Sequence, residues 1–432
     1  MGKIADSLNN YWKTASLPIK RQAEAAANTA SAAATTANSA ASTATAAQEA
    51  ANEAKTAVNN LIMYKKMTVK IDLSNSNPNT CCTYADDAAD LTAGSAAWDE
   101  FFGHYPVMLK NGVEGKKLTR NNFALHEDGT AADITSGSEG DVMIAFPRRG
   151  LRITTIGNII TVSMTDNPND PDYEYNAHRR GSTGKEKFYL GAYKGFESDS
   201  KLRSLSGKAP TSNKTIGAFR TLAQANGAAN GAGGSGYDQS GFYQLVFRQA
   251  MYLLKYKTLD SQTAVGRGYV DTGVAYTTYN AATTGGTNTK GMDWGETTGN
   301  QQMKLFGLED FWGNIWEWID GLFSDASYNI LTGTQGFNDT GDGYENQGKG
   351  ATANIGNYMS KPQGSTGAGF IAKEVSGSAT TYFCDAANLS ASRLPGFGGS
   401  WDYASSAGAF RLHVNSTASY AAVDIAGRLM YL

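Results

Sequence analysis

Few residues in this 432-residue chain have the types and spacing that catalysis or metal binding requires. The chain has four histidines, which are His104, His126, His178 and His413. None stands in a recognisable metal-ligand spacing. The three cysteines, Cys81, Cys82 and Cys384, include no CxxC pair, and adjacent cysteines very rarely bond to each other. No string favours a Ser-His-Asp triad or a pair of catalytic carboxylates. We therefore predict no catalytic residue, no metal site, no cofactor and no disulfide framework, and synthesis in a reducing cytoplasm.

Two short strings are similar to ligand-binding loops but depart from them at required positions. Residues 181–186 (Gly-Ser-Thr-Gly-Lys-Glu) are like part of a phosphate loop, but Glu186 replaces the required hydroxyl residue and the upstream glycine is missing. Residues 338–343 have the polar side chains of a calcium loop, but Gly341 stands at a ligand position. The first string is set aside, and calcium at the second is the less favoured interpretation.

The composition indicates a globular chain with many turns. Glycine occurs 49 times, charged residues make up only 18% of the chain, and the formal net charge is −3. A charge this small provides no electrostatic footprint for nucleic acid, so we predict no nucleic-acid partner. Residues 1–6 lack a secretory signal and a myristoylation motif, and no apolar run is long enough to cross a bilayer. We therefore expect a soluble protein without membrane insertion, and the length predicts more than one structural region.

The strongest indication of function is the pattern of the last forty-odd residues, about 389–432. The stretch 410–415 (Phe-Arg-Leu-His-Val-Asn) alternates between apolar and polar residues, which predicts a strand with Arg411, His413 and Asn415 on its open face. The residues around it are small, polar or aromatic in no obvious order. Antibody paratopes have this composition, because Tyr provides rigid contact area while Ser and Asn provide adaptable hydrogen bonds. An ordinary half-buried edge strand is the alternative.

We predict a ligand-binding face in this segment. Its members are Ser400, Asp402, Tyr403, Ser405, Ser406, Arg411, His413, Asn415, Ser416, Ala421, Ala422, Asp424 and Ala426. The residues of the segment that look like fixed framework are Gly398, Gly399, Trp401, Gly408, Gly427 and Arg428.

An alanine-rich N-terminal stretch carries a heptad repeat. Alanine recurs every seven residues from Ala23 to Ala51, and a second heptad set is offset from the first by three or four residues. Unbroken a and d positions predict a left-handed coiled coil. A flexible linker is the alternative, since Thr, Asn and Ser weaken a helix and alanine buries little surface. We predict an attachment segment at 1–18, a coiled-coil stalk at 19–66 and a globular domain at 67–432, with a homotrimer as the hypothesis for the assembly.

The pattern changes after the repeat. Strand-like runs occur at 67–73, 151–156 and 159–164. Residues 240–256 carry apolar side chains at helical spacing and predict one buried helix. The glycine-rich stretch 227–236 and the irregular region 258–400 predict loops, which suits a small sheet carrying extensive ordered loops.

The most specific string in the chain is 307–318, with the sequence Gly-Leu-Glu-Asp-Phe-Trp-Gly-Asn-Ile-Trp-Glu-Trp. It resembles the G-x-x-D-x-x-G-N-x-W-E-W motif of formylglycine-generating-enzyme-like domains, a branch of the C-type lectin fold. The family's second hallmark, G-G-S-W followed by a terminal G-x-R-type strand, is matched by 398–401 and 427–429, about ninety residues after the first. The resemblance covers roughly 67–432 and implies an α+β C-type lectin fold. The framework residues that it implies in the first string are Gly307, Asp310, Gly313, Asn314, Trp316, Glu317 and Trp318.

Within that branch, the closing segment resembles the variable proteins of diversity-generating retroelements, which include phage and bacterial ligand-binding proteins related to the major tropism determinant. In these proteins, mutagenesis of template adenines scatters AAC-type codons over many residues. Such codons cannot produce Lys, Glu or Gln if only their first two bases change, and this chain has none of the three after Glu374.

The resemblance implies a receptor-binding protein of a phage tail fibre, because the stalk also resembles a tail-fibre shaft. The variable face would bind a host cell-surface receptor, protein or glycan, and the N-terminus would bind a phage tail or baseplate protein. The protein would be made in the host cytoplasm and reside in the virion. A cell-encoded adhesin of the same fold is the alternative.

The family resemblance also raises an enzymatic alternative. Formylglycine-generating enzymes hold copper with two closely spaced cysteines near the C-terminus, whereas Cys384 has no partner cysteine near it in the sequence. The calcium–sugar motifs E-P-N and Q-P-D of C-type lectins are also absent. Trp316, Trp318 and Trp401 could stack on sugars, but their place inside the framework motifs favours a core role. We therefore predict that the chain is not an enzyme.

Overall fold

The computed structural model describes residues 2–61, 64–228 and 236–432. It forms two compact units, Met1–Tyr64 and Lys65–Leu432, called here the N-terminal and C-terminal units. Most of the predicted glycine-rich loop at 227–236 lies outside the described residues. The side chains of the predicted attachment segment, apart from that of Pro18, also lie outside them.

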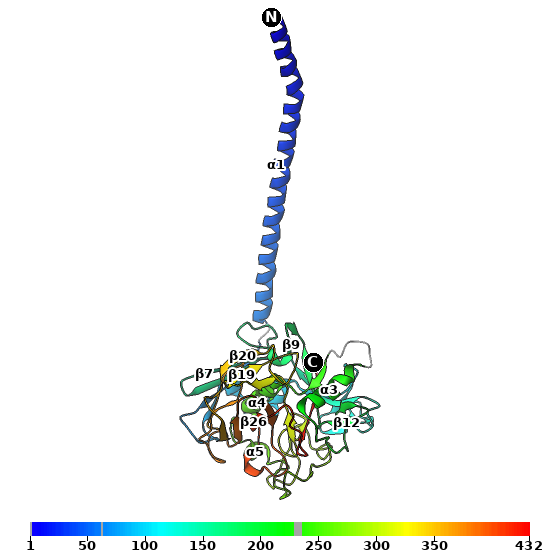
Figure 1. Cartoon of the computed structure of the whole chain (residues 1–432), viewed down its shortest axis with the longest axis vertical. Coiled ribbons are helices and arrows are strands. Elements are labelled where there is room, and N and C mark those ends of the chain that lie inside the picture. The colour runs from blue at the N-terminus through cyan, green and yellow to red at the C-terminus, as the bar shows by residue number, and fades with distance from the viewer. Residues whose placement is uncertain (1, 62–63, 229–235) are drawn as a thin grey trace. The chain divides into compact units, whose positions relative to one another are not determined.

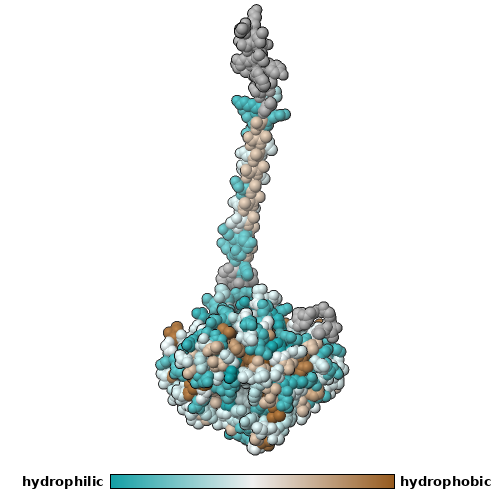
Figure 2. Space-filling view, in the orientation of Figure 1, coloured by the Kyte–Doolittle hydropathy of each residue, from teal (hydrophilic) through white to brown (hydrophobic). Residues whose placement is uncertain are grey.

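The N-terminal unit is a single helix, α1 (Gly2–Leu61), drawn in blue in Figure 1. The helix continues through Pro18, so the predicted boundary at residue 18 does not interrupt it. Every side chain from Lys20 to Lys55 is exposed, and Figure 2 shows the alanines of this stretch as a pale brown band between teal polar ends. Most helical stability in proteins comes from packing an apolar face, and the described side chains from Lys20 to Lys55 pack none within their own unit.

The C-terminal unit combines helices and sheets, which confirms the α+β class. Its helices are α2 (Ala97–Phe102), α3 (Ile216–Ala228), α4 (Phe242–Tyr256) and α5 (Ser261–Val265), with 3-10 turns η1 (Asp87–Asp90), η2 (Asn176–His178) and η3 (Ala404–Ser406). The predicted buried helix at 240–256 is confirmed by α4, which Figure 1 shows in the middle of the unit. Its Phe247 ring lies 5.4 Å from the ring of Phe188 in the largest sheet. No described helix is both long and apolar enough to cross a membrane.

One antiparallel sheet contains the three strands that the sequence predicted at 67–73, 151–156 and 159–164. In spatial order it consists of β2 (Cys82–Asp86), β1 (Lys66–Asp72), β8 (Ile159–Thr165) and β7 (Gly150–Ile156). Val69, Val162 and Ile153 lie opposite one another across three of these strands, and all three are buried. The β-branched residues that produced the strand-like pattern therefore form one face of the core.

The largest sheet has seven strands. In spatial order they are β14 (Tyr237–Gln239), β28 (Leu429–Tyr431), β11 (Lys187–Gly191), β6 (Asp141–Pro147), β3 (Tyr105–Lys110), β4 (Val113–Thr119) and β5 (Asn122–His126). Strand β28 lies between β14 and β11 and pairs with both. The end of the C-terminal segment is thus built into the sheet.

A six-stranded sheet contains the end of the first family-like string, and two of its strands end directly before the two parts of the second string. Its order is β21 (Ile355–Tyr358), β24 (Ala386–Leu389), β26 (Leu412–Ser416), β25 (Leu394–Phe397), β17 (Trp316–Trp318) and β27 (Ile425–Ala426). The predicted strand at 410–415 is β26, which begins two residues later than expected.

Short strands complete the unit. They are the sheet β18 (Leu322–Ser324), β19 (Asn329–Thr332) and β20 (Glu345–Lys349), and the pairs β9 (Arg179–Arg180) with β10 (Thr183–Gly184), β12 (Phe196–Ser198) with β13 (Lys201–Arg203), β15 (Lys304–Leu305) with β16 (Leu308–Glu309), and β22 (Lys361–Pro362) with β23 (Ala372–Glu374). The prediction of an all-loop region at 258–400 was therefore wrong. Strands this short show too few alternations to be recognised by period.

Candidate ligand-binding face

The two family-like strings meet around one buried carboxylate, Glu317. Its oxygens accept hydrogen bonds from Arg428 Nε at 2.7 Å, Lys194 Nζ at 3.1 Å and Arg248 Nη2 at 3.2 Å. All four side chains are completely buried. Burial alone would raise the pKa of Glu317, but the three cations outweigh it and hold this pKa well below the usual carboxylate value.

Arg428 ties this carboxylate to the backbone. Its Nη1 donates to Gly191 O at 2.8 Å, and its Nη2 donates to Glu309 O at 2.9 Å. Five donor hydrogens in a rigid planar group suit arginine to such a buried junction. The junction fixes the backbone at the point where the C-terminal segment enters the largest sheet.

The other end of the segment is fixed by a glycine corner. Gly398 and Gly399 have φ values of 95° and 85°, a region that favours glycine. Gly398 N donates to Arg411 O at 2.9 Å, and Gly313 N donates to Gly398 O at 3.2 Å. The structure buries every residue that was predicted as framework by the family resemblance, from Gly307 to Arg428.

A pocket of about 250 Å³ lies between this frame and the exposed part of the segment. We call it the C-terminal pocket. It is lined by Trp316, Arg393, Gly396, Tyr403, His413, Asn415, Ser416, Thr417, Tyr420, Asp424 and Ile425.

Three rings and a guanidinium group form the rigid side of the pocket. The Trp316 ring centre lies 5.0 Å from that of Tyr403, at 82°, and 4.9 Å from that of His413. The guanidinium carbon of Arg411 lies 4.4 Å from the Tyr403 ring centre and 5.1 Å from that of Trp316. Cation–π contacts of this kind are stronger when desolvated, and Arg411 is buried. Arg411 therefore positions the aromatic wall.

The pocket is nearly neutral but contains one unpaired carboxyl oxygen. Burial, together with the charge of Arg411, holds the pKa of His413 well below its usual value, so its ring is uncharged at neutral pH. Burial raises the pKa of Asp424 to about 6. Among the described residues, Asp424 Oδ1 has no hydrogen-bond partner. Aromatic walls beside an acceptor suit a ligand that presents a hydrogen-bond donor within an apolar surface.

The structure brings five of the thirteen predicted binding residues to this pocket. They are Tyr403, His413, Asn415, Ser416 and Asp424. Five more are exposed or half-buried elsewhere in the segment, namely Asp402, Ser405, Ser406, Ala421 and Ala422. Ser405 Oγ lies 3.2 Å from Tyr358 Oη, and Asp402 Oδ2 accepts from Tyr276 N at 2.8 Å.

Four of the thirteen are buried, which corrects their assignment to an open face: Ser400, Arg411, Asp424 and Ala426. Arg411 precedes the first residue of β26, so the alternation does not apply to it and its side chain packs under Tyr403. Ala426 pairs with Glu317 inside the six-stranded sheet. Ser400 follows the glycine corner and donates to Asp402 Oδ1 at 3.1 Å. Asp424 is buried but still lines the pocket.

Comparison with known proteins assigns neither a family nor a function to the chain. No protein-family model matches the chain, and no curated protein matches it significantly. Within residues 2–61, 64–228 and 236–432, no group of three or more His, Cys, Asp or Glu side chains is arranged to hold a metal ion. In the calcium-loop-like string at 338–343, the Asn338 side chain is engaged within the loop, because its Oδ1 accepts hydrogen bonds from the backbone amides of Thr340 and Asp342.

Sequence reasoning missed several residues of the pocket. Tyr420 and Thr417 lie in the same variable-looking segment and share its composition, so the paratope argument could have included them. Arg393 and Gly396 carried no such signal. Trp316 was predicted to have a core role only, whereas it is 6% exposed and forms a wall of the pocket.

Substitutions of two alanines from the predicted set test which positions of the segment can be exchanged and which are fixed by packing. Ala426→Tyr should destabilise the protein by about 1–3 kcal/mol, because Ala426 is fully buried and the larger side chain overpacks its site. Ala421→Tyr should change stability by no more than about 0.5 kcal/mol, because Ala421 is exposed. Urea unfolding followed by tryptophan fluorescence measures both. Equal losses in the two variants would contradict the division between face and frame.

Proposed function

We propose that this chain is a receptor-binding protein whose C-terminal pocket, with the exposed residues around it, forms an exchangeable ligand-binding surface. The observation that carries the proposal is the separation of roles within residues 398–428. Gly398 and Arg428 fix the ends of the segment in buried hydrogen bonds, while Tyr403, His413 and Asn415 face a pocket that the fixed backbone holds open. Asn415 is exposed, so its side chain can be replaced without disturbing the core, whereas Tyr403 and His413 are half-buried against the Trp316 ring.

We also propose a more specific setting for this surface. The C-terminal unit would have a C-type lectin fold of the formylglycine-generating-enzyme-like branch, diversified by a retroelement. The protein would be part of a phage tail fibre, with α1 directed to a tail or baseplate protein and the pocket directed to a host cell-surface receptor. Two family-like strings that meet at Glu317 support the fold, and the absence of Lys, Glu and Gln after Glu374 supports the diversification.

Sequencing of the gene and its downstream DNA from many isolates tests this proposal. We expect differences between isolates at codons for Tyr403, His413 and Asn415, and none at those for Glu317 and Arg428. A near-copy of the segment, with adenines at the variable codons and a reverse transcriptase gene beside it, should follow. Variation as frequent at Glu317 and Arg428 as at the pocket positions would refute the proposal. Flanking tail genes distinguish a phage protein from a cell-encoded adhesin.

The environment of the Cys384 thiol does not support the oxidase alternative. Cys384 is buried, and burial raises the pKa of its thiol. Copper binds the thiolate form, so this environment disfavours the ligand that such an enzyme needs.

We further propose that three copies of α1 associate through their alanine seams. A single α1 leaves these alanines exposed, which gives them a reason to pack against other copies. A trimer would also present several weak binding surfaces together, which raises the overall affinity without new contacts. Sedimentation equilibrium of the full chain should give about three times the chain mass of 45.8 kDa.

Aspartates placed in the seam test this association. Ala37→Asp with Ala40→Asp puts charges at a and d positions and should reduce the sedimenting mass to that of one chain. Thr35→Asp with Ser42→Asp is the matched control, because it adds the same charges on the outer side of the heptad. A monomeric wild-type chain at micromolar concentration, or equal dissociation in both variants, would defeat the hypothesis.

A further inference from the structure

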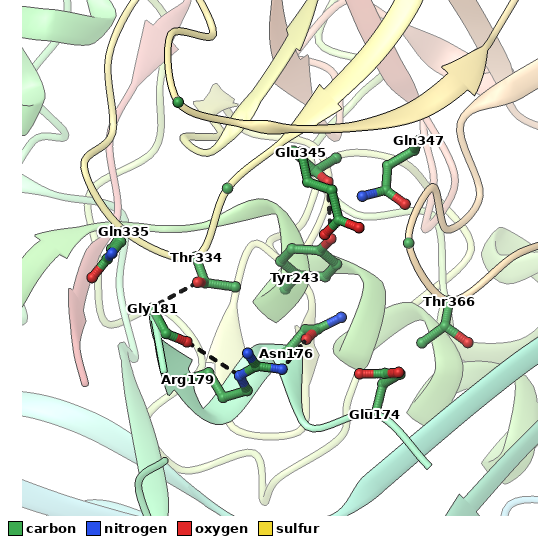
Figure 3. A pocket seen from close by; sticks show the side chains of 14 residues that line it. Glu174, Asn176, Arg179, Gly181, Tyr243, Thr334, Gln335, Glu345, Gln347 and Thr366 are labelled. Carbon is green, nitrogen blue, oxygen red and sulfur yellow. Dashed lines mark hydrogen bonds between the residues drawn. The ribbon is translucent and has the colours of Figure 1, made fainter. Parts of the chain in front are cut away.

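A second, larger cavity lies outside the C-terminal segment. Its volume is about 620 Å³, and we call it the polar dish (Figure 3). It is lined by Glu174, Asn176, Arg179, Gly181, Tyr243, Thr332, Gly333, Thr334, Gln335, Gly343, Glu345, Gln347, Thr366 and Gly367. It shares no residue with the C-terminal pocket, and none of its residues belongs to 389–432.

The floor of the dish is a pair of buried hydroxyl groups. Tyr243 Oη and Thr332 Oγ1 lie 2.9 Å apart, and their residues are 6% and 1% exposed. Each hydroxyl carries one proton, and their mutual hydrogen bond uses one of the two. The second proton has no acceptor among the described residues. Burial raises the pKa of Tyr243, so the phenol keeps its proton and remains a donor.

The rim presents polar side chains that are free to bind a ligand. Figure 3 shows Glu174, Gln335, Glu345 and Gln347 around the central Tyr243. The carboxylates and side-chain amides of these four form no hydrogen bond with another residue in the part of the chain that the structure describes. The dish thus has carboxylate acceptors and amides that both donate and accept.

The remaining polar groups hold the shape of the dish. Arg179 Nε donates to Gly181 O at 3.2 Å, and Gly181 N donates to Thr334 Oγ1 at 3.1 Å. These bonds connect β9 and the turn after it to the loop after β19. Because Gly181 N is occupied, the phosphate-loop-like string that begins there does not offer this amide to a phosphate.

The chemistry of the lining selects among classes of ligand. Two carboxylates and one guanidinium give the dish a formal charge of −1, which disfavours an anion. An apolar ligand would bury the rim groups without hydrogen bonds, at a cost of about 1–3 kcal/mol for each group. A simple cation would pair with the carboxylates but leave the amides and the floor proton unmatched. A neutral saccharide has vicinal hydroxyls that donate to carboxylates and accept from amides and phenols, and so it matches all three.

We propose that the polar dish is a binding site for a short neutral oligosaccharide. Its volume is within the range of small-molecule sites, about 300–1,000 Å³. The site goes beyond the receptor-binding surface proposed above and does not depend on it. Because its residues lie outside the variable segment, the dish would bind the same class of sugar in every variant of the protein.

An array of immobilised glycans, probed with the full-length chain, tests this site. We expect binding to neutral oligosaccharides and not to sialylated or sulfated ones. Glu345→Gln combined with Gln347→Ala should weaken that binding by about tenfold or more, because hydrogen bonds that involve a charged group are among the stronger ones. These two rim side chains are exposed or half-buried, so the variant should fold, and an unchanged melting temperature verifies this.

His413→Ala is the control, because it alters only the C-terminal pocket and should leave glycan binding unchanged. Tyr243→Phe removes one of the two floor hydroxyls and should also weaken binding. The proposal is overturned if no neutral glycan binds, if anionic glycans bind better, or if the rim variant binds as well as the wild type. Loss of glycan binding in His413→Ala but not in the rim variant would place the sugar in the C-terminal pocket, which overturns this inference but not the receptor-binding proposal.

Discussion

Replacing Glu317 by glutamine should destabilise the protein by about 3–5 kcal/mol, the usual cost of removing one partner from a buried ion pair. The amide keeps the size and shape of the side chain but removes the negative charge. Lys194, Arg248 and Arg428 would then be three buried cations without the carboxylate that they share. Because Arg428 also anchors the backbone beside β28, the loss should reach the largest sheet.

Urea unfolding at low salt, followed by tryptophan fluorescence, measures this effect. Glu345→Gln is the matched control: it is the same chemical change at an exposed side chain, and it should shift the free energy of unfolding by no more than about 0.5 kcal/mol. A loss below about 1 kcal/mol for Glu317→Gln would show that the three cations do not depend on this carboxylate.

Trp316→Ala should have an effect of similar size, about 3–5 kcal/mol, because it removes a large and nearly buried side chain. It should also disorder the pocket wall. Tyr403, His413 and Arg411 all contact the Trp316 ring, so its removal leaves their side chains without the surface that holds them. We expect a reduced near-ultraviolet circular dichroism signal at temperatures where the far-ultraviolet signal is unchanged.

Tyr420→Ala provides the comparison for Trp316→Ala. Tyr420 lines the same pocket, is 39% exposed, and its ring centre lies 6.0 Å from that of Trp318 in the frame. Its loss should cost about 1 kcal/mol or less and leave the other rings in place. If the two variants lose equal stability, Trp316 is not the support of the pocket wall.

Long and regular elements could be predicted from the sequence, and short ones could not. Strands β1, β7 and β8 and helix α4 follow from apolar periodicity, since each presents one continuous face to the core. Helix α3 was missed because Gly217 and Gly227 and its many small residues hide its buried side. The strands between 258 and 400 are only two to five residues long, and distant segments rather than local pattern decide their pairing.

The candidate site was predictable in part for the same reason. The segment that carries Tyr403, His413 and Asn415 could be found from its alternation and composition. Its exact register could not, because one residue decides whether Arg411 lies inside β26 or before it. The polar dish could not be found at all, since its residues come from separate stretches around 174–181, 332–347 and 366–367, with Tyr243 from α4.

The position of β27, Arg428 and β28 at the end of the C-terminal segment has a consequence for synthesis. A growing chain emerges from the ribosome N-terminus first, so the largest sheet stays incomplete until the segment has been translated. A frameshift or premature stop within the segment would delete the strand between β14 and β11 together with the anchor of Glu317. Such a product could not close its core and would be left to proteolysis. Frameshifts and premature stops that arise when these codons are changed would therefore be removed before a damaged copy is assembled.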